Sequence, residues 1–164
     1  MNIAIVGSRD FHNFSFLKTH VLSIIKNNNI SITKIISGGA KGIDTLAEKF
    51  ASTFHIPTEI IHADWSKGKF AGVTRNTDIV DKSDVVIAFW NGVSKGTLDS
   101  INKAKKKNKK LFIVKIDAHS LGEGVRLGGS GDYIFDFAKD EKDDILKLKY
   151  NSDYISKKNN RWDA

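Results

Sequence analysis

The sequence has no cysteine among its 164 residues, which excludes a disulfide framework and a thiolate metal site. It has no apolar run near the roughly 20 residues that a membrane-spanning helix needs. Its first residues lack the basic stretch and long apolar core of a signal peptide. The histidines show no metal-ligand spacing. We therefore expect a cytoplasmic protein with no membrane contact, no metal site and no resident cofactor.

The composition is that of an ordinary globular domain, with 40% hydrophobic and 27% charged residues. The formal net charge is +7, and much of the excess lies in the lysine-rich run 103–110. That run is either a solvated helix face with its exit loop or a surface that contacts a phosphate backbone. A basic balance fits nucleic acid and equally an anionic small ligand.

Apolar runs alternate with helical patterns over the first 117 residues. The strands are apolar on both faces, which implies helices on both sides of a parallel sheet. Right-handed crossovers then give an α/β fold, a Rossmann-like doubly wound parallel sheet of about five strands in the order 3-2-1-4-5. Strands are expected at residues 3–6, 34–36, 58–61, 84–89 and 111–114, and helices at 14–26, 43–51, 75–81 and 97–107.

The alternation ends after residue 117. Glycines crowd residues 122–131 and predict a loop, while 135–148 is either one more helix or a poorly ordered stretch. We therefore expect a Rossmann-like core over residues 1–117 and a loop-rich C-terminal extension over residues 118–164.

Ligands of doubly wound sheets bind at the carboxyl ends of the strands, where the strand order reverses. The first expected strand ends in Gly7, Ser8, Arg9 and Asp10. A glycine lets the backbone approach a ligand, and an arginine offers a planar fork of donors to a phosphate or carboxylate. The alternative is a plain turn with a surface arginine.

The second expected strand ends in a run of small residues that opens a helix. Backbone N–H groups and the helix dipole suit an anion there, and Lys41 adds positive charge. Asp44 either caps the helix or holds a ribose hydroxyl. The run is neither a Walker loop nor the three-glycine dinucleotide fingerprint, so hydride chemistry is disfavoured. Its candidate ligand-binding residues are Ser37, Gly38, Gly39, Ala40, Lys41, Gly42 and Asp44.

The fourth expected strand is followed by Gly96 and Thr97, which repeat the same anion-binding pattern at a helix start. Asp99 lies near that helix start and is the candidate catalytic carboxylate. It would act as a base or bind ribose, and the alternative is a helix cap or a partner of the helix dipole.

Arg75 and Asn76 precede the fourth expected strand, on a short helix. The arginine is expected to clamp a phosphate, and a salt bridge to a nearby aspartate is the alternative. Trp65 and Trp90 would either stack on a base or close the edge of the core.

Together, these motifs resemble the SLOG superfamily, which includes the DNA-processing protein DprA/Smf, the LOG phosphoribohydrolases and the YspA-type (cpYpsA-related) proteins. The sequence is most similar to the YspA-type branch. The resemblance implies a Rossmann-like fold, a nucleotide bound at the glycine-rich strand ends, and homo-oligomers. It rests on residues 5–10, 37–44, 63–65, 71–76 and 96–97.

The sequence departs from the pattern of the LOG enzymes at one position. LOG enzymes release a base from a ribose monophosphate and carry a glutamate three residues after the threonine of their glycine-threonine motif. Ser100 stands at that position here, and the nearest carboxylate is Asp99. The DprA branch binds single-stranded DNA and a recombinase, and its usual flanking domains are absent from this sequence.

Three functions follow, in this order. The first is a module that senses or sequesters a nucleotide or a nucleotide derivative such as an ADP-ribose-like molecule. The second is an N-glycosidase or phosphoribohydrolase in which Asp99 supplies the carboxylate and Asp44 or Asp10 assists. The third is a binder of single-stranded DNA that uses the run 103–110 for phosphates and a tryptophan for base stacking.

Overall fold

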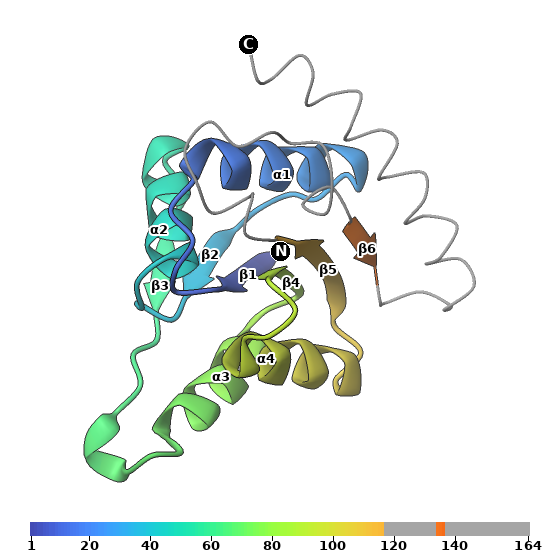
Figure 1. The fold of residues 1–164 in the computed structure, drawn as a ribbon. Coiled ribbons are helices and arrows are strands. Elements are labelled where there is room, and N and C mark those ends of the chain that lie inside the picture. Colours follow the sequence, from blue (N-terminus) through green and yellow to red (C-terminus); the bar gives the residue numbers. More distant parts are fainter. Residues whose placement is uncertain (117–133, 137–164) are drawn as a thin grey trace.

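The fold is a mixed sheet of six strands in the order β3-β2-β1-β4-β5-β6, covered by helices on both faces (Figure 1). The structure is a computed structural model, and it describes residues 1–116 and 134–136. Strands β1 to β5 pair in parallel, and β6 pairs antiparallel with β5. The strands are β1 (Asn2–Gly7), β2 (Lys34–Ser37), β3 (Thr58–Ile60), β4 (Val85–Trp90), β5 (Lys110–Lys115) and β6 (Ile134–Asp136), and the helices are α1 (Phe14–Asn27), α2 (Ile43–Thr53), α3 (Ala71–Lys82) and α4 (Lys95–Lys106), with a short 3-10 helix η1 (Trp65–Lys67).

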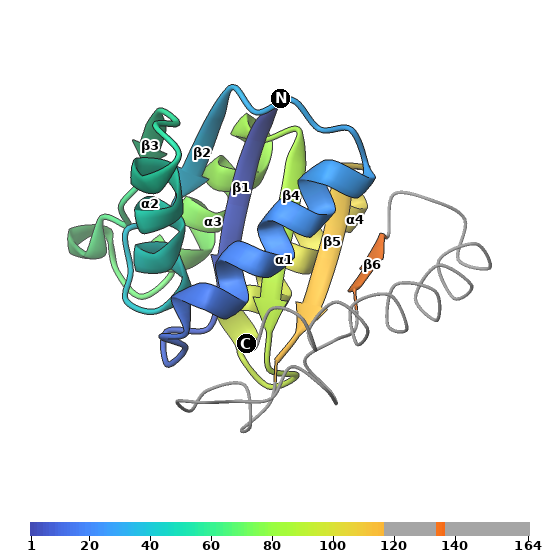
Figure 2. The same ribbon diagram turned by 90° about the horizontal axis from the view of Figure 1, so that it is seen from above.

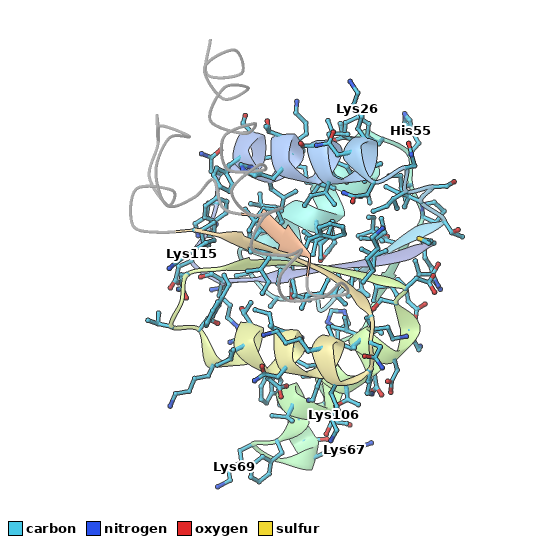
Figure 3. All side chains as sticks on the ribbon, turned by 90° about the vertical axis from the view of Figure 1, so that its right-hand side faces the viewer. Lys26, His55, Lys67, Lys69, Lys106 and Lys115 are labelled. Carbon is cyan, nitrogen blue, oxygen red and sulfur yellow. The ribbon has the colours of Figure 1, made fainter. Side chains whose placement is uncertain are left out.

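The central strands are buried on both faces because successive side chains point to opposite sides of the sheet. In β1, Ile3 and Ile5 pack with α1 and α2, whereas Ala4 and Val6 pack with α3 and α4. Two apolar layers result, one on each face, and Figure 3 shows the sheet edge-on between them. This is the arrangement expected for strands that are apolar at every position.

The chain changes faces between β3 and β4. Helices α1 and α2 cover one face, α3 and α4 cover the other, and the strand order reverses between β1 and β4 (Figure 2). The carboxyl ends of β1, β2 and β4 therefore meet at one edge, where doubly wound sheets bind ligands.

The predicted fold class and the order of the first five strands are confirmed. Helix α3 begins at Ala71, four residues earlier than predicted, and η1 and β6 were not predicted. The first two residues of the predicted segment 135–148 belong to β6; its remainder and the predicted loop at 122–131 lie outside the described residues. The division at residue 117 stays a prediction. Within the described part of the chain, no helix has the length and apolar character to cross a membrane.

His20 is a fully buried polar side chain on α1. Its ring stacks on Phe16 with 4.1 Å between the ring centroids, and its Nδ1 lies 2.8 Å from the Phe16 carbonyl oxygen. Nε2 has no hydrogen-bond partner. The neutral ring with a proton on Nδ1 fits this environment, because a proton on Nε2 would be a buried donor without an acceptor. Burial accordingly lowers the pKa of His20 to about 4.

This burial makes stability depend on pH. The unfolded chain binds a proton on His20 near pH 6.5, whereas the folded chain binds it only near pH 4. The contribution of neutral His20 to the free energy of unfolding is therefore fully present above pH 6.5. About 3 kcal/mol of it is lost as the pH drops from 6.5 to 4. Urea denaturation across this range measures the loss. His20→Leu, which has no titrating ring, should remove that part of the pH dependence, and an unchanged profile would contradict the assignment.

Candidate functional site

A hollow of about 460 Å³ opens at the carboxyl edge of β1, β2 and β4. We call it the inner hollow. It is lined by the cations Arg9 and Arg75, by two carboxylates, by amides and hydroxyls, and by a few apolar side chains. Its lining residues are Val6, Gly7, Ser8, Arg9, Asp10, Ala40, Asp44, Arg75, Asn76, Ile79, Asn91, Val93, Ser94, Gly96, Thr97 and Ser100.

The loop after β1 forms the floor of the inner hollow and packs on the start of α2. The Ser8 carbonyl accepts a hydrogen bond from the Ile43 amide at 3.1 Å, and the Ser8 hydroxyl accepts one from the Asp10 amide at 3.3 Å. Gly42 has φ +72°, and a Cβ there would lie 2.4 Å from the Ser8 carbonyl oxygen. Gly42 is therefore needed for the close packing of these two segments, and it does not line the hollow.

The turn after β2 is held by its own polar groups. The Ser37 hydroxyl donates to Glu48 Oε2 at 2.9 Å and accepts from the Gly39 amide at 3.2 Å. The Ala40 amide donates to Asp44 Oδ2 at 3.1 Å. Ser37 thus fixes the turn without lining the hollow, whereas Ala40 in the turn and Asp44 in the first turn of α2 both line it.

Asp44 is a nearly buried carboxylate on the wall of the inner hollow, 7% exposed. Burial raises its pKa, and the Ala40 amide and the charges of Arg75 and Arg9 oppose that rise. The negative charge of Glu48 adds to the rise. The carboxyl therefore holds its proton more readily than an exposed aspartate does.

Arg75 reaches from α3 across the edge of the sheet. Its Nη1 donates to the Gly38 carbonyl oxygen at 2.7 Å, and its Nε donates to Asn76 Oδ1 at 3.2 Å. A Cβ on Gly38 would lie 2.8 Å from Nη1, so a side chain there would displace the guanidinium from this position. The predicted clamp residue is thus oriented by the backbone, and it also lines the hollow.

The start of α4 forms the remaining wall. Ser94 caps the helix by accepting from the Thr97 amide at 3.4 Å, and its own amide donates to Asn91 Oδ1 at 2.8 Å. Trp90 Nε1 donates to the Ser94 carbonyl oxygen at 3.1 Å. Trp90 therefore supports the cap from behind and is not among the lining residues. Gly96 and Thr97, in the first turn of α4, line the hollow, and the Thr97 amide is bonded to the Ser94 cap.

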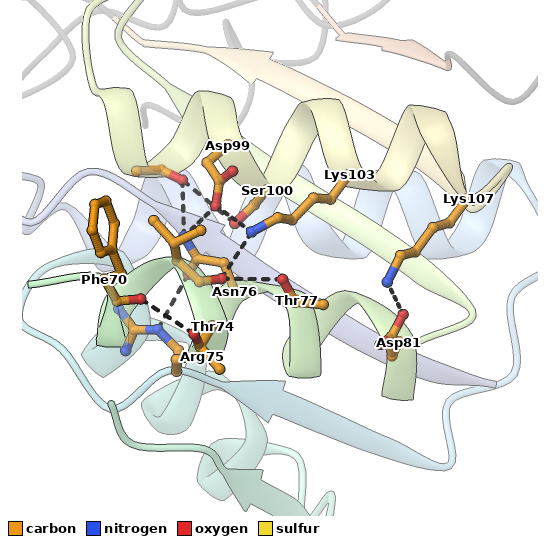
Figure 4. A network of polar contacts seen from close by, with 12 residues as sticks. Phe70, Thr74, Arg75, Asn76, Thr77, Asp81, Asp99, Ser100, Lys103 and Lys107 are labelled. Carbon is orange, nitrogen blue, oxygen red and sulfur yellow. Dashed lines mark hydrogen bonds and ion pairs between the residues drawn. The ribbon is translucent and has the colours of Figure 1, made fainter. Parts of the chain in front are cut away.

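Asp99 does not line the inner hollow. Its Oδ2 pairs with Lys103 Nζ at 2.7 Å and accepts from Asn76 Nδ2 at 3.1 Å (Figure 4). Lys103 also donates to the Val73 carbonyl oxygen at 2.8 Å. Asp99 thus joins α4 to α3 and orients Asn76, and Asp44 and Asp10 are the carboxylates that face the hollow.

The other predicted residues fall into two groups. Gly7, Ser8, Arg9, Asp10, Ala40, Asp44, Arg75, Asn76, Gly96 and Thr97 line the inner hollow, whereas Gly38, Gly39 and Lys41 line a neighbouring hollow. Among the lining residues of the inner hollow, sequence reasoning missed Val6, Ile79, Asn91, Val93, Ser94 and Ser100. Ser94 begins a helix and has a serine's preference for the N-cap, a signal that the sequence carries. No group of three or more potential ligands among residues 1–116 and 134–136 has the arrangement of a metal site.

The first 68 residues match the family model of the YspA, cpYpsA-related SLOG family, which confirms the predicted resemblance. A comparison with curated protein sequences gives no match.

Two solved structures have similar folds. One is DNA processing protein A (DprA) from Streptococcus pneumoniae, with 21% identity and a TM-score of 0.58 over 76% of this chain and 54% of that chain. The other is DNA processing protein A from Helicobacter pylori, whose structure describes a single-stranded DNA binding mode. It has 23% identity and a TM-score of 0.54 over 72% of this chain and 66% of that chain. This chain thus spans about half to two thirds of the length of these proteins, and at such identities the likeness establishes the fold.

The close packing at Gly42 predicts a large difference between two glycine substitutions. Gly42→Ala should lower the free energy of unfolding by about 2 kcal/mol or more, because it combines a left-handed backbone with a clash on Ser8. Gly96→Ala is the matched control, since a Cβ there meets nothing within 4 Å. It should leave stability unchanged or raise it slightly, as alanine favours a helix. Urea denaturation of both variants measures this difference. Equal free energies of unfolding for the two variants would refute the packing argument.

Proposed function

We propose that this chain, whose first 68 residues match the YspA, cpYpsA-related SLOG family, binds a nucleotide or a nucleotide-derived molecule in the inner hollow. The observation that carries the proposal is the convergence of Arg9 and Arg75 with the capped start of α4 around one cavity. Cytoplasmic location and self-association stay predictions.

The size and lining of the inner hollow support a ligand of this class. About 460 Å³ lies within the range of small-molecule sites, which hold a ligand by apolar walls and a few oriented polar groups. Val6, Ile79 and Val93 supply apolar surface, and hydroxyl and amide groups supply donors and acceptors. A base and a sugar need both kinds of contact.

The charges of the hollow imply an orientation. Arg9 and Arg75 stand on the wall nearest the turn after β2, and phosphate oxygens pair best with guanidinium groups. Asp10 and Asp44 repel a phosphate but accept hydrogen bonds from sugar hydroxyls. The phosphate is therefore expected at the arginine wall, with the ribose beside the carboxylates.

Single-stranded DNA is a weaker proposal for the lysine-rich run. Lys103 pairs with Asp99, and Lys107 pairs with Asp81 on α3 (Figure 4). Lys109 donates to the Asp81 carbonyl oxygen. These pairings turn part of the run toward α3, so fewer of its charges are available to a phosphate backbone.

Hydrolysis of the N-glycosidic bond is the second candidate function, and the buried Asp44 favours it. In its ionised form, the Asp44 carboxylate can stabilise positive charge that develops on the ribose as the base leaves. Water then adds to the sugar carbon, so that AMP would give adenine and ribose 5-phosphate.

Arg9 offers the sharper test of binding, because its side chain makes no hydrogen bond to any of the described residues, whereas Arg75 also supports the fold. Arg9→Ala should weaken AMP binding about tenfold or more in titration calorimetry, since it removes charge-assisted hydrogen bonds to phosphate. Its thermal midpoint should stay at the wild-type value. Lys26→Ala, an exposed cation near the far end of α1 (Figure 3), is the control that should leave binding unchanged. If wild type binds neither AMP nor ADP-ribose, the proposal fails.

Asp44 and Asp99 give a matched pair for the hydrolytic alternative. If wild type releases adenine from AMP, Asp44→Asn should slow the release by about 100-fold or more, and Asp99→Asn should change it much less. Chromatography of free base measures both rates. Loss of release in Asp99→Asn alone would identify Asp99 as the catalytic carboxylate, as the sequence predicts. No release of adenine by wild type would exclude hydrolysis of AMP.

A further inference from the structure

A second hollow of about 510 Å³ lies on the other side of the arginine wall. We call it the outer hollow. It shares Arg9, Ala40 and Arg75 with the inner hollow, and its remaining lining comes from the turn after β2 and from the segment between β3 and η1. Those remaining residues are Gly38, Gly39, Lys41, His62, Ala63 and Trp65. Because both hollows share the two arginines, one ligand can lie across them.

The outer hollow differs in charge from the inner one. Lys41, His62 and the two shared arginines line it, and none of its lining residues is a carboxylate. The inner hollow, by contrast, contains Asp10 and Asp44. Negative charge is therefore favoured at the shared wall and outward from it, more than deep in the inner hollow.

Trp65 presents an aromatic surface to the outer hollow. It is 58% exposed at the start of η1, and Asp64 caps that turn by accepting from the Ser66 amide at 3.2 Å. A Cβ on Gly72 would lie 3.2 Å from Trp65 Cη2, so the tip of the indole ring lies against the bare backbone of α3. A large exposed ring whose tip is held against a helix is suited to stacking on a base.

His62 is placed beside it by a second glycine. A Cβ on Gly39 would lie 2.5 Å from His62 Cε1, and the φ of Gly39 is +71°. The imidazole therefore packs directly on the turn after β2. The two aromatic rings of the outer hollow thus each lie against a glycine backbone.

We propose that the two hollows together bind one dinucleotide, with its diphosphate on Arg9 and Arg75, one nucleoside in the inner hollow and the second base stacked on Trp65. This inference rests on the proposed nucleotide-binding function and names its ligand class. A mononucleotide leaves the outer hollow unused, whereas two nucleosides joined by a diphosphate fill both sides of the wall.

The test compares mononucleotides with dinucleotides of the same base. Titration calorimetry of wild type should give affinities about tenfold or more higher for diadenosine diphosphate than for AMP, or for diguanosine diphosphate than for GMP, because stacking adds to binding. Trp65→Ala should remove this advantage and leave mononucleotide binding within about twofold, whereas Trp65→Phe should keep most of it.

Phe70→Ala is the matched control. Phe70 is also an exposed aromatic near the start of α3, 67% exposed, but it lines neither hollow. It should leave the advantage intact, and circular dichroism should show each variant folded. Equal affinities for mononucleotide and dinucleotide, or an equal loss of both in Trp65→Ala, would overturn the two-part site and leave the proposed function standing. No binding of any of the four nucleotides, together with no binding of ADP-ribose, would overturn both.

Discussion

Arg75 holds the two sides of the sheet edge together. It starts from α3 on one face, and its guanidinium donates to the Gly38 carbonyl oxygen in the turn that leads to α2 on the other face. A Cβ on Gly38 would lie 2.7 Å from Asp44 Oδ2 and 2.8 Å from Arg75 Nη1, so a side chain at residue 38 would displace both groups from these positions. The wall between the two hollows is this contact. A guanidinium stays charged when half-buried, so the group that closes the edge also supplies its positive charge.

The main features of the fold followed from local pattern. Short strands that are apolar at every position predicted a sheet covered on both faces, and the crossover rule predicted the order of the first five strands. The prediction missed the first four residues of helix α3 because Ala71 to Thr74 carries no apolar stripe. Only Ala71 among those four residues is buried. Strand β6 pairs with β5 from a distant part of the chain, and a pairing of that kind leaves no mark in a short window of sequence.

The candidate site residues at the ends of strands could be predicted from the sequence. Residues on helices were harder to predict, because their position depends on which face of the helix turns toward the hollow. Arg9, Arg75 and Thr97 surround one hollow, as the rule for doubly wound sheets requires. Asp99 was chosen by its place in a motif, but the buried face of α4 carries Thr97 and Ser100, and Asp99 lies on the flank with Lys103 four residues on. An acidic residue four positions before a lysine is a helical ion-pair signal, and this one was present in the sequence. The stacking proposed for Trp65 depends on its contact with Gly72 on α3, which sequence spacing alone does not reveal.

The buried carboxyl of Asp44 couples the proposed ligand to proton binding. Burial raises its pKa, and the charges of Arg75 and Arg9 hold that rise in check. A phosphate at the arginine wall would neutralise those charges, which removes the restraint and adds a negative charge nearby. Both effects raise the pKa of Asp44 further, because each disfavours the carboxylate. By linkage, a group whose pKa rises on binding takes up a proton with the ligand, so anion binding and protonation of Asp44 favour each other. A neutral carboxyl gains an O–H donor while keeping an acceptor. Protonated Asp44 could therefore either donate a hydrogen bond to a sugar hydroxyl or accept one from it.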